Sequence, residues 1–126
     1  MKLQDLIDTN VSNEQKENLT ILLDNIINPL LNEWVKLKND PFIITTCLGE
    51  GKKYHKNSPH LTGEAVDIST KSIAKNKELF ELARSLNLPY NYIISENNYR
   101  NIHIAIGLRR KQKTVKIPYQ TLNIIY

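Results

Sequence analysis

The sequence predicts an α+β domain in which helices pack on a small, mostly antiparallel sheet. Two segments have apolar residues at helical spacing, and several short segments are apolar and β-rich, with polar loops between them. The helical segments precede and interrupt the β-rich ones, which is typical of the α+β class. The length fits one domain over residues 1–126, and an apolar content of 40% is enough for a small core.

The first helical segment opens with a capping box, in which Ser12 is followed three residues later by Gln15. A stripe of apolar residues follows at helical spacing and should face the core. It consists of Leu19, Leu22, Leu23, Ile26, Ile27, Leu30, Trp34 and Leu37. Pro29 lies inside the stripe and should kink the helix or split it in two, because proline removes a backbone N–H group. The sequence Asn39-Asp40-Pro41 should then end the helix.

After this helix, two strands are predicted over residues 42–46 and 65–69, with a polar loop over residues 48–64 between them. A loop of this length in a compact domain is usually functional or disordered. A second helix is predicted over residues 73–86. Its buried side should consist of Leu79, Phe80, Leu82, Ala83 and Leu86. Three further strands are predicted over residues 91–95, 101–106 and 115–117.

Two of these strands carry an acid or an imidazole on the face opposite their apolar residues. Because side chains alternate across a strand, Asp67 points away from the valine and isoleucine beside it, and His103 points away from its neighbouring isoleucines. His60 lies on the loop before the first of these strands. Gly63 permits a sharp turn between His60 and Asp67, because glycine tolerates positive φ.

His60, Asp67 and His103 are therefore candidate ligands for one zinc ion. Zinc in a hydrolase takes three protein ligands and keeps one position open for water, and neutral imidazole and carboxylate are suitable donors. The three residues have an ordinary interpretation as well, as a loop histidine, a satisfied aspartate and an interior histidine. Cys47, the single cysteine, excludes an internal disulfide. We interpret it as a packed thiol at a strand end, with a fourth metal ligand as the alternative.

The basic residues narrow the class of partner. Much of the formal net charge of +4 lies at Lys52, Lys53, Lys56 and residues 109–113. This distribution fits either a solvated surface or attraction to an anionic polymer, such as cell wall or nucleic acid. Nucleic acid is disfavoured as a partner because no aromatic residues are interleaved with the basic residues and the sequence has no recognisable nucleic-acid-binding motif.

Residues 58–68, Ser-Pro-His-Leu-Thr-Gly-Glu-Ala-Val-Asp-Ile, resemble the motif Ser-x-His-x-x-Gly-x-Ala-x-Asp-Ile. This motif belongs to the zinc D-alanyl-D-alanine carboxypeptidase family, which includes the L-alanyl-D-glutamate endopeptidases of phage lysins and shares its fold with the Hedgehog signalling domain. The resemblance implies His60 and Asp67 as zinc ligands. It also implies His103 as the third, because Ile102-His103-Ile104 resembles the downstream Trp-Val-His-Val strand of the family.

The resemblance extends over residues 25–106 and implies a fold with N-terminal helices on one face of the sheet and the zinc site on the other. The implied activity is zinc-dependent hydrolysis of peptide bonds in peptidoglycan stem peptides. Such a reaction needs a carboxylate that takes a proton from water and delivers it to the leaving amine. Glu96, seven residues before His103, is the candidate for this role, and a solvated loop glutamate is its ordinary interpretation. Glu64 is a weaker candidate.

The chain departs from the family pattern at two places. Many members carry the catalytic acid three residues before the last histidine, where this chain has Arg100, which cannot act as a base. The stretch over residues 46–50 lacks the arginine that holds a substrate carboxylate in the family. Arg100, Lys53 and Ser58 are the candidate substrate-binding residues, and His55 is a further candidate near the site.

Two readings of function follow from these patterns. The first is a zinc peptidase of the cell wall, possibly phage-encoded. The alternative is a catalytically impaired wall-binding protein, or a structural protein of a phage particle, that retains the peptidase fold. No apolar run approaches the ~20 residues of a bilayer span, and the first five residues lack the order of a secretory signal. We therefore expect a chain that is cytoplasmic as synthesised and reaches the wall after lysis or as part of a virion.

Overall fold

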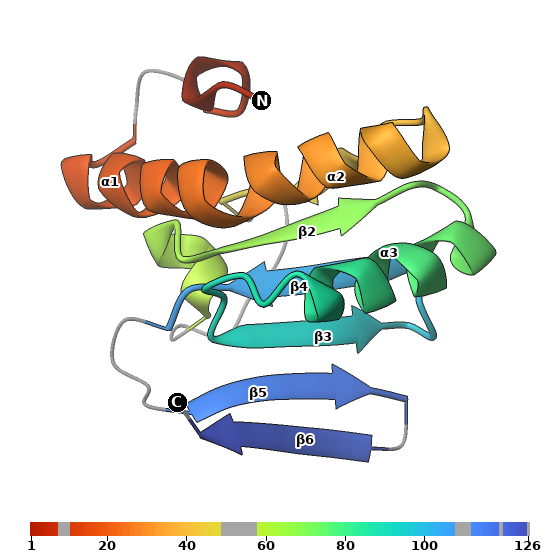
Figure 1. Cartoon of the computed structure of the whole chain (residues 1–126). Coiled ribbons are helices and arrows are strands. Elements are labelled where there is room, and N and C mark those ends of the chain that lie inside the picture. Colours follow the sequence, from red (N-terminus) through yellow and green to blue (C-terminus); the bar gives the residue numbers. More distant parts are fainter. Residues whose placement is uncertain (8–10, 49–57, 108–111, 119, 126) are drawn as a thin grey trace.

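The computed structural model of the chain describes residues 1–7, 11–48, 58–107, 112–118 and 120–125. Within these ranges, six strands form one mixed sheet with the order β1-β2-β4-β3-β5-β6 (Figure 1). The strands are β1 (Ile43–Thr46), β2 (Ala65–Ser69), β3 (Tyr92–Glu96), β4 (Asn101–Ala105), β5 (Gln112–Ile117) and β6 (Gln120–Ile125). Strands β3 and β5 are parallel and the other neighbours are antiparallel. The predicted α+β class is confirmed.

The N-terminal helical region consists of α1 (Asn13–Leu22), a π-helical turn η2 (Leu23–Ile27) and α2 (Asn28–Lys38), after a short 3-10 helix η1 (Leu3–Asp5). The capping box of Ser12 and Gln15 is present in both directions. Pro29 was expected to kink the helix or split it in two, and the chain instead stays helical from residue 13 to 38, with a change of hydrogen-bond pattern before the proline. The change takes the form of the widened η2 turn, in which the Asn28 N–H donates to the carbonyl of Leu23, and α1 and α2 stay nearly in line (Figure 1). Asn39, with φ of 50°, ends α2.

The core lies between these helices, α3 (Ile73–Ser85) and one face of the sheet. It contains the predicted stripe from Leu19 to Trp34 together with residues of the central strands. Those strand residues are Val66, Ile68, Ile93, Ile102, Ile104 and Val115. The prediction is wrong for Leu37, which is 63% exposed because it lies in the last turn of α2, where neighbouring elements no longer cover that side of the helix. In α3, Leu79, Phe80 and Ala83 are buried, whereas Leu82 and Leu86 are half-buried.

The C-terminal part of the sheet is larger than the sequence predicted. Residues 115–117 were expected to form a short strand, but β5 starts at Gln112 and pairs with a second strand, β6, that was not predicted. Together they form a hairpin that joins the sheet through the parallel pairing of β5 with β3. In the described ranges, no helix combines the length and the apolar character that a membrane crossing would require.

Of the long polar loop, Leu48 and the end from Ser58 on are described. At that end the chain forms a 3-10 helix η3 (Pro59–Thr62) that ends at Gly63, which has φ of 78°. This left-handed conformation is strained for a residue with a side chain. Space is also limited, because a Cβ at Gly63 would lie 2.6 Å from the backbone oxygen of Gln15. Glycine at this position therefore lets the chain turn from η3 into β2 while η3 stays close to α1.

Candidate metal centre

Strand pairing brings the predicted acid and the second predicted histidine together. In the antiparallel register of β2 on β4, Asp67 lies directly opposite His103. Opposed residues point to the same face of a sheet. Their apolar neighbours Val66 and Ile104 also oppose each other and point into the core. The two candidate ligands therefore share the face of the sheet that is turned away from the core.

His60 reaches the same place from η3, which is tied to the protein at both ends. The Ser58 hydroxyl caps η3 by accepting the His60 backbone N–H at 3.4 Å. The side chains of Gln15 and Asn18 in α1 donate to the carbonyl oxygens of Leu61 and Thr62, each at 2.9 Å. These contacts, with the turn at the glycine that follows, fix the direction in which His60 points.

The three candidate ligand atoms form a nearly equilateral triangle. His103 Nδ1 lies 3.0 Å from Asp67 Oδ1 and 3.1 Å from His60 Nε2, and His60 Nε2 lies 3.2 Å from Asp67 Oδ1. In a tetrahedral site with metal–ligand bonds of about 2.05 Å, any two ligand atoms are about 3.3 Å apart. The observed spacing is thus close to the edge length of such a tetrahedron. Among the described residues, these three make up the one group of histidine, cysteine and acidic side chains that is close enough to hold a metal ion.

The tautomer of His60 favours a cation at the centre of the triangle. Its Nδ1 lies 3.2 Å from the carbonyl oxygen of Cys47. A carbonyl oxygen can only accept, so Nδ1 carries the proton, and in the neutral ring Nε2 keeps its lone pair. That lone pair faces the Asp67 carboxylate oxygen at 3.2 Å and can be balanced by a proton donated from His103 Nδ1, by a proton on Nε2 or by a metal ion. A backbone acceptor on the outer ring nitrogen is also the usual support for a metal-binding histidine.

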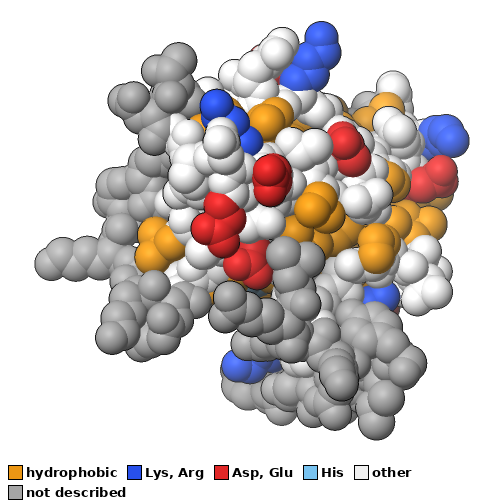
Figure 2. All heavy atoms as spheres, turned by 90° about the vertical axis from the view of Figure 1, so that its left-hand side faces the viewer, with side chains coloured by type: hydrophobic (Ala, Val, Ile, Leu, Met, Phe, Trp, Pro, Cys, Tyr) orange, Lys and Arg blue, Asp and Glu red, His pale blue; other side chains and the backbone are white. Residues whose placement is uncertain are grey.

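The electrostatics of the centre keep Asp67 ionised. Burial opposes this, but hydrogen bonds from His103 and His60 and their positive charge hold the pKa of Asp67 well below its usual range. Burial likewise works to lower the pKa of His60, and the hydrogen bond and negative charge of Asp67 outweigh it, so the pKa of His60 is raised. The three side chains are almost fully enclosed, at 3%, 6% and 7% exposed for His60, Asp67 and His103. On the side of the molecule shown in Figure 2, no histidine is visible among the described atoms.

Glu96 lies on the same face as the three ligands. In the register of β3 on β4, Ile94 opposes His103 and Glu96 opposes Asn101, so alternate residues of β3 share the face of His103. Burial raises the pKa of Glu96, and the negative charge of Asp67 and a hydrogen bond to it raise it further, while His103 and His60 act in the opposite direction. The charges of Asp67, His103 and His60 therefore all act on Glu96, although Glu96 does not belong to the group that is close enough to hold a metal ion.

The turn that follows Glu96 is held in an uncommon conformation. Residues 97–99 all have positive φ, between 49° and 68°, which non-glycine residues rarely adopt. Asn76 of α3, 1% exposed, donates its side-chain amide to the carbonyl oxygens of Tyr99 at 2.7 Å and Arg100 at 3.1 Å. The packed helix thus fixes the turn between the strand of Glu96 and the strand of His103.

The candidate substrate-binding residues have different positions. Arg100 is exposed just before β4, and its carbonyl oxygen accepts the Ser69 hydroxyl at 3.2 Å. Ser58 serves as the cap of η3 described above, at the edge of the centre. Lys53 lies outside the described residues, as do Lys52 and His55.

Two other candidates for the site have ordinary partners. Cys47 is buried just after β1, as predicted for a packed thiol, and it is not part of the group that could hold a metal. The carboxylate of Glu64 accepts the Thr62 hydroxyl at 2.7 Å, which gives it a role in holding the end of η3. Two neighbours of the centre were not predicted from the sequence. The backbone carbonyl of Cys47 is a partner of His60, and the ring of Tyr92 lies 6.1 Å from that of His103. Tyr92 could have been predicted, because it lies two residues before Ile94 and four before Glu96, and alternate residues of a strand share one face.

No model of a protein family, no curated protein and no solved structure matches this chain. What the structure shows is an α+β fold with a buried group, His60, Asp67 and His103, that could hold a metal ion.

Proposed function

We propose that this chain is a zinc-dependent hydrolase that cleaves peptide bonds in peptidoglycan stem peptides. The observation that carries the proposal is the triangle of two imidazole nitrogens and one carboxylate oxygen, with edges of 3.0–3.2 Å. The resemblance of residues 58–68 to the carboxypeptidase motif supplies the substrate class and the expectation of a Hedgehog-like fold. In this proposal the protein reaches the wall after host lysis or as part of a phage particle.

The donor set favours zinc over the other common divalent ions. Magnesium and calcium prefer sites built from oxygen ligands, whereas zinc accepts imidazole nitrogen and carboxylate oxygen in a tetrahedral arrangement. Two of the three candidate ligand atoms here are imidazole nitrogens. A zinc ion held by His60, Asp67 and His103 would supply a Lewis acid for the scissile carbonyl.

Glu96 supplies the proton transfers in this proposal. A general base and acid works best when its pKa lies near the operating pH. Without a metal ion, burial and the Asp67 charge raise the pKa of Glu96, and a bound zinc ion would act in the opposite direction. Glu96 takes a proton from the attacking water and returns it to the leaving amine. The low exposure of the three ligand side chains strengthens the electrostatic contacts among them.

A second candidate function is a wall-binding or phage-particle protein that keeps the fold but is catalytically impaired. The observation that favours it is Arg100, an exposed residue three positions before His103, where related peptidases commonly have their acid. If Glu96 does not act as the base, the chain loses the roughly 10²–10⁴-fold contribution that general acid–base catalysis makes. Metal content alone does not separate the two functions, because both retain the ligands.

The deciding experiment measures zinc content and the release of peptide fragments from purified peptidoglycan by the same preparation. We expect about one zinc per chain and fragment release by the native protein. Glu96→Gln should keep the zinc and lose release by roughly 10²-fold or more, and His103→Ala should lose both. Glu78→Gln is the matched control, because Glu78 is exposed on α3 and outside the centre, and it should behave like the native protein.

Each outcome has a distinct meaning. Equal release by the native protein and Glu96→Gln would show that the base is misassigned. Zinc without any release by the native protein would favour the binding or particle function. A native protein that takes up no zinc would refute the proposal as a whole.

A further inference from the structure

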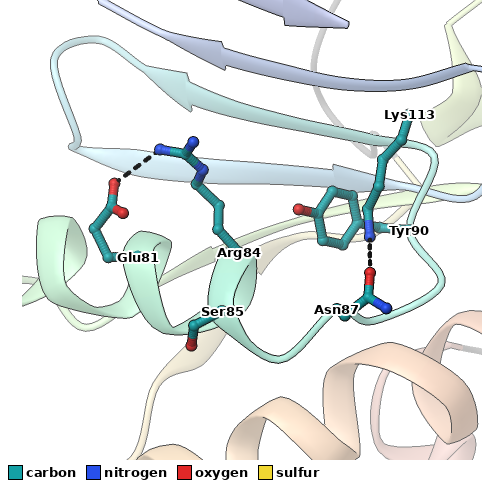
Figure 3. A pocket seen from close by; sticks show the side chains of 6 residues that line it. All are labelled: Glu81, Arg84, Ser85, Asn87, Tyr90 and Lys113. Carbon is teal, nitrogen blue, oxygen red and sulfur yellow. Dashed lines mark hydrogen bonds and ion pairs between the residues drawn. The ribbon is translucent and has the colours of Figure 1, made fainter. Parts of the chain in front are cut away.

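A pocket of about 300 Å³ lies between the end of α3 and the start of β5, away from the candidate metal centre (Figure 3). Its lining residues are Glu81, Arg84, Ser85, Asn87, Tyr90 and Lys113. In Figure 3, the Glu81 and Arg84 side chains lie together on one side, and Lys113 lies beside the Tyr90 ring and Asn87 on the other. A volume of this size falls at the lower end of the range for small-molecule sites.

Lys113 is the unusual member of this group, because its ammonium group is buried among neutral partners. The residue is 5% exposed, and its Nζ lies 3.9 Å from the centre of the Tyr90 ring. Nζ donates to the carbonyl oxygen of Leu88 at 2.7 Å and, at the long distance of 3.5 Å, to the side-chain oxygen of Asn87. A ring face and two neutral oxygens stabilise an ammonium group, but they do not neutralise its charge.

The charges around the pocket do not balance. Within the described part of the chain, Lys113 forms no ion pair with a carboxylate, and the ion pair of Arg84 is with Glu81 at 3.2 Å. The pocket therefore carries one acidic and two basic side chains and has a net charge of +1. Buried charges in proteins are normally paired, because an isolated charge is costly to remove from water. Burial accordingly lowers the pKa of Lys113, and an anion in the pocket would counter that effect.

We infer that this pocket binds the carboxylate group of a small organic acid, with Lys113 and Arg84 as its positive partners. The net charge of +1 matches a single carboxylate better than a phosphate dianion. The contact from Lys113 to Asn87 is the longest of its contacts, and Asn87 is exposed, so a carboxylate oxygen can replace it without loss of the short bond to Leu88. The Tyr90 ring and the remaining volume accommodate the rest of the ligand.

The pocket and the metal centre lie on opposite faces of the sheet. In the parallel register of β5 on β3, Tyr92 is paired with Thr114, and the ring of Tyr92 contacts that of His103. Because side chains alternate, Lys113 and Val115 point to the other face, where Val115 joins the core. The carboxylate site therefore does not depend on the proposed hydrolase, and each of the two can fail without the other.

The test is a titration of the protein, followed by amide NMR, with N-acetylalanine as the probe. Its neutral amide, N-acetylalaninamide, and inorganic phosphate are titrated in parallel at equal ionic strength. We expect the acid to cause saturable shifts at Ser85, Asn87 and Tyr90, and the neutral amide to cause none. Lys113→Met should weaken binding of the acid by roughly tenfold or more, the cost of one hydrogen bond to a charged group.

Two further variants keep the result interpretable. Arg84→Gln changes a side chain at the surface of α3 and should weaken binding of the acid even if Lys113→Met fails to fold. Lys77→Met is the matched control, because Lys77 also lies over a tyrosine ring, at 5.6 Å from that of Tyr99, but outside the pocket. It should bind the acid like the native protein. Absence of saturable shifts with the acid, equal binding of acid and amide, tighter binding of phosphate than of the acid, or undiminished binding by Arg84→Gln would each overturn the inference.

Discussion

Replacing Gly63 with alanine tests whether the turn between η3 and β2 positions His60. The substitution has two costs. An alanine at φ of 78° carries the strain of the left-handed region, about 1–2 kcal/mol. Its Cβ would also lie 2.6 Å from the backbone oxygen of Gln15 and 3.1 Å from Leu19 Cγ, so η3 or the first turn of α1 must move.

The movement has a further cost that can be worked out from the contacts between η3 and α1. Two hydrogen bonds of 2.9 Å join these elements, one from Gln15 to Leu61 and one from Asn18 to Thr62. Losing one of them costs about 1 kcal/mol. Strain and the lost bond together predict a decrease of about 2–3 kcal/mol in the free energy of unfolding. Because η3 carries His60, the affinity for zinc should also decrease.

The free energy of unfolding is measured by urea denaturation of the metal-free protein, and zinc affinity by competition with a chelator. Glu14→Ala is the control, since Glu14 is exposed in the first turn of α1 next to Gln15. It should leave both quantities nearly unchanged. A Gly63→Ala protein with native stability and native zinc affinity would refute the reasoning, because it would show that the turn tolerates a side chain and does not set the position of His60.

The remaining predictions concern pH, the turn after Glu96 and the first helix. The pKa of His60 is raised by folding, so its contribution to stability is fully present below its unfolded pKa of about 6.5 and is lost as pH rises through its folded pKa. The pKa of Asp67 is lowered by folding, so its contribution is present above its unfolded pKa of about 3.9 and is lost as pH falls through its folded pKa. The metal-free protein should therefore have its highest Tm between about pH 4 and 6.5, and saturating zinc should remove the decrease in Tm above that range. A Tm of the metal-free protein that rises from about pH 6.5 to 8 would contradict the prediction. Asn76→Ala should lower the free energy of unfolding, measured in urea, by about 3 kcal/mol, because it leaves several buried groups without hydrogen-bond partners. It should also reduce fragment release by more than the loss of folded protein explains. Native behaviour in both assays would show that Asn76 does not hold the turn. Ser12→Ala should cost about 1 kcal/mol in the same urea assay, and Ser12→Asp should restore it; no restoration would mean that the capping contact is not the cause.

The features predicted correctly from the sequence are those with a strong local signal. The capping box at Ser12, the buried stripe up to Trp34 and the glycine turn at Gly63 each depend on a few adjacent residues. The convergence of Asp67 and His103 was predictable in outline, because strand alternation puts each on the polar face, although only the register of β2 on β4 makes them opposite neighbours.

The features that were missed depend on contacts between distant parts of the chain. Leu37 follows the helical period but lies beyond the reach of the core, and the sequence has no sign of where the covering elements end. The backbone carbonyl of Cys47 is invisible to any argument from residue types, since every residue has one. Lys113 was placed in a basic run, and its burial follows from the approach of its Nζ to Leu88 and Tyr90 in the segment after α3, which no local pattern indicates.

The order of strands divides the sheet into two parts, each with one of the two proposed sites. His60, Asp67, His103 and Glu96 all belong to β2, β4, β3 or the segment that leads into them, whereas the hairpin of β5 and β6 is added beyond β3 by one parallel pairing. A change in the length or sequence of that hairpin would reshape the Lys113 pocket and leave the spacing of the ligand triangle intact. The proposed carboxylate site and the proposed hydrolase centre can therefore change independently of each other.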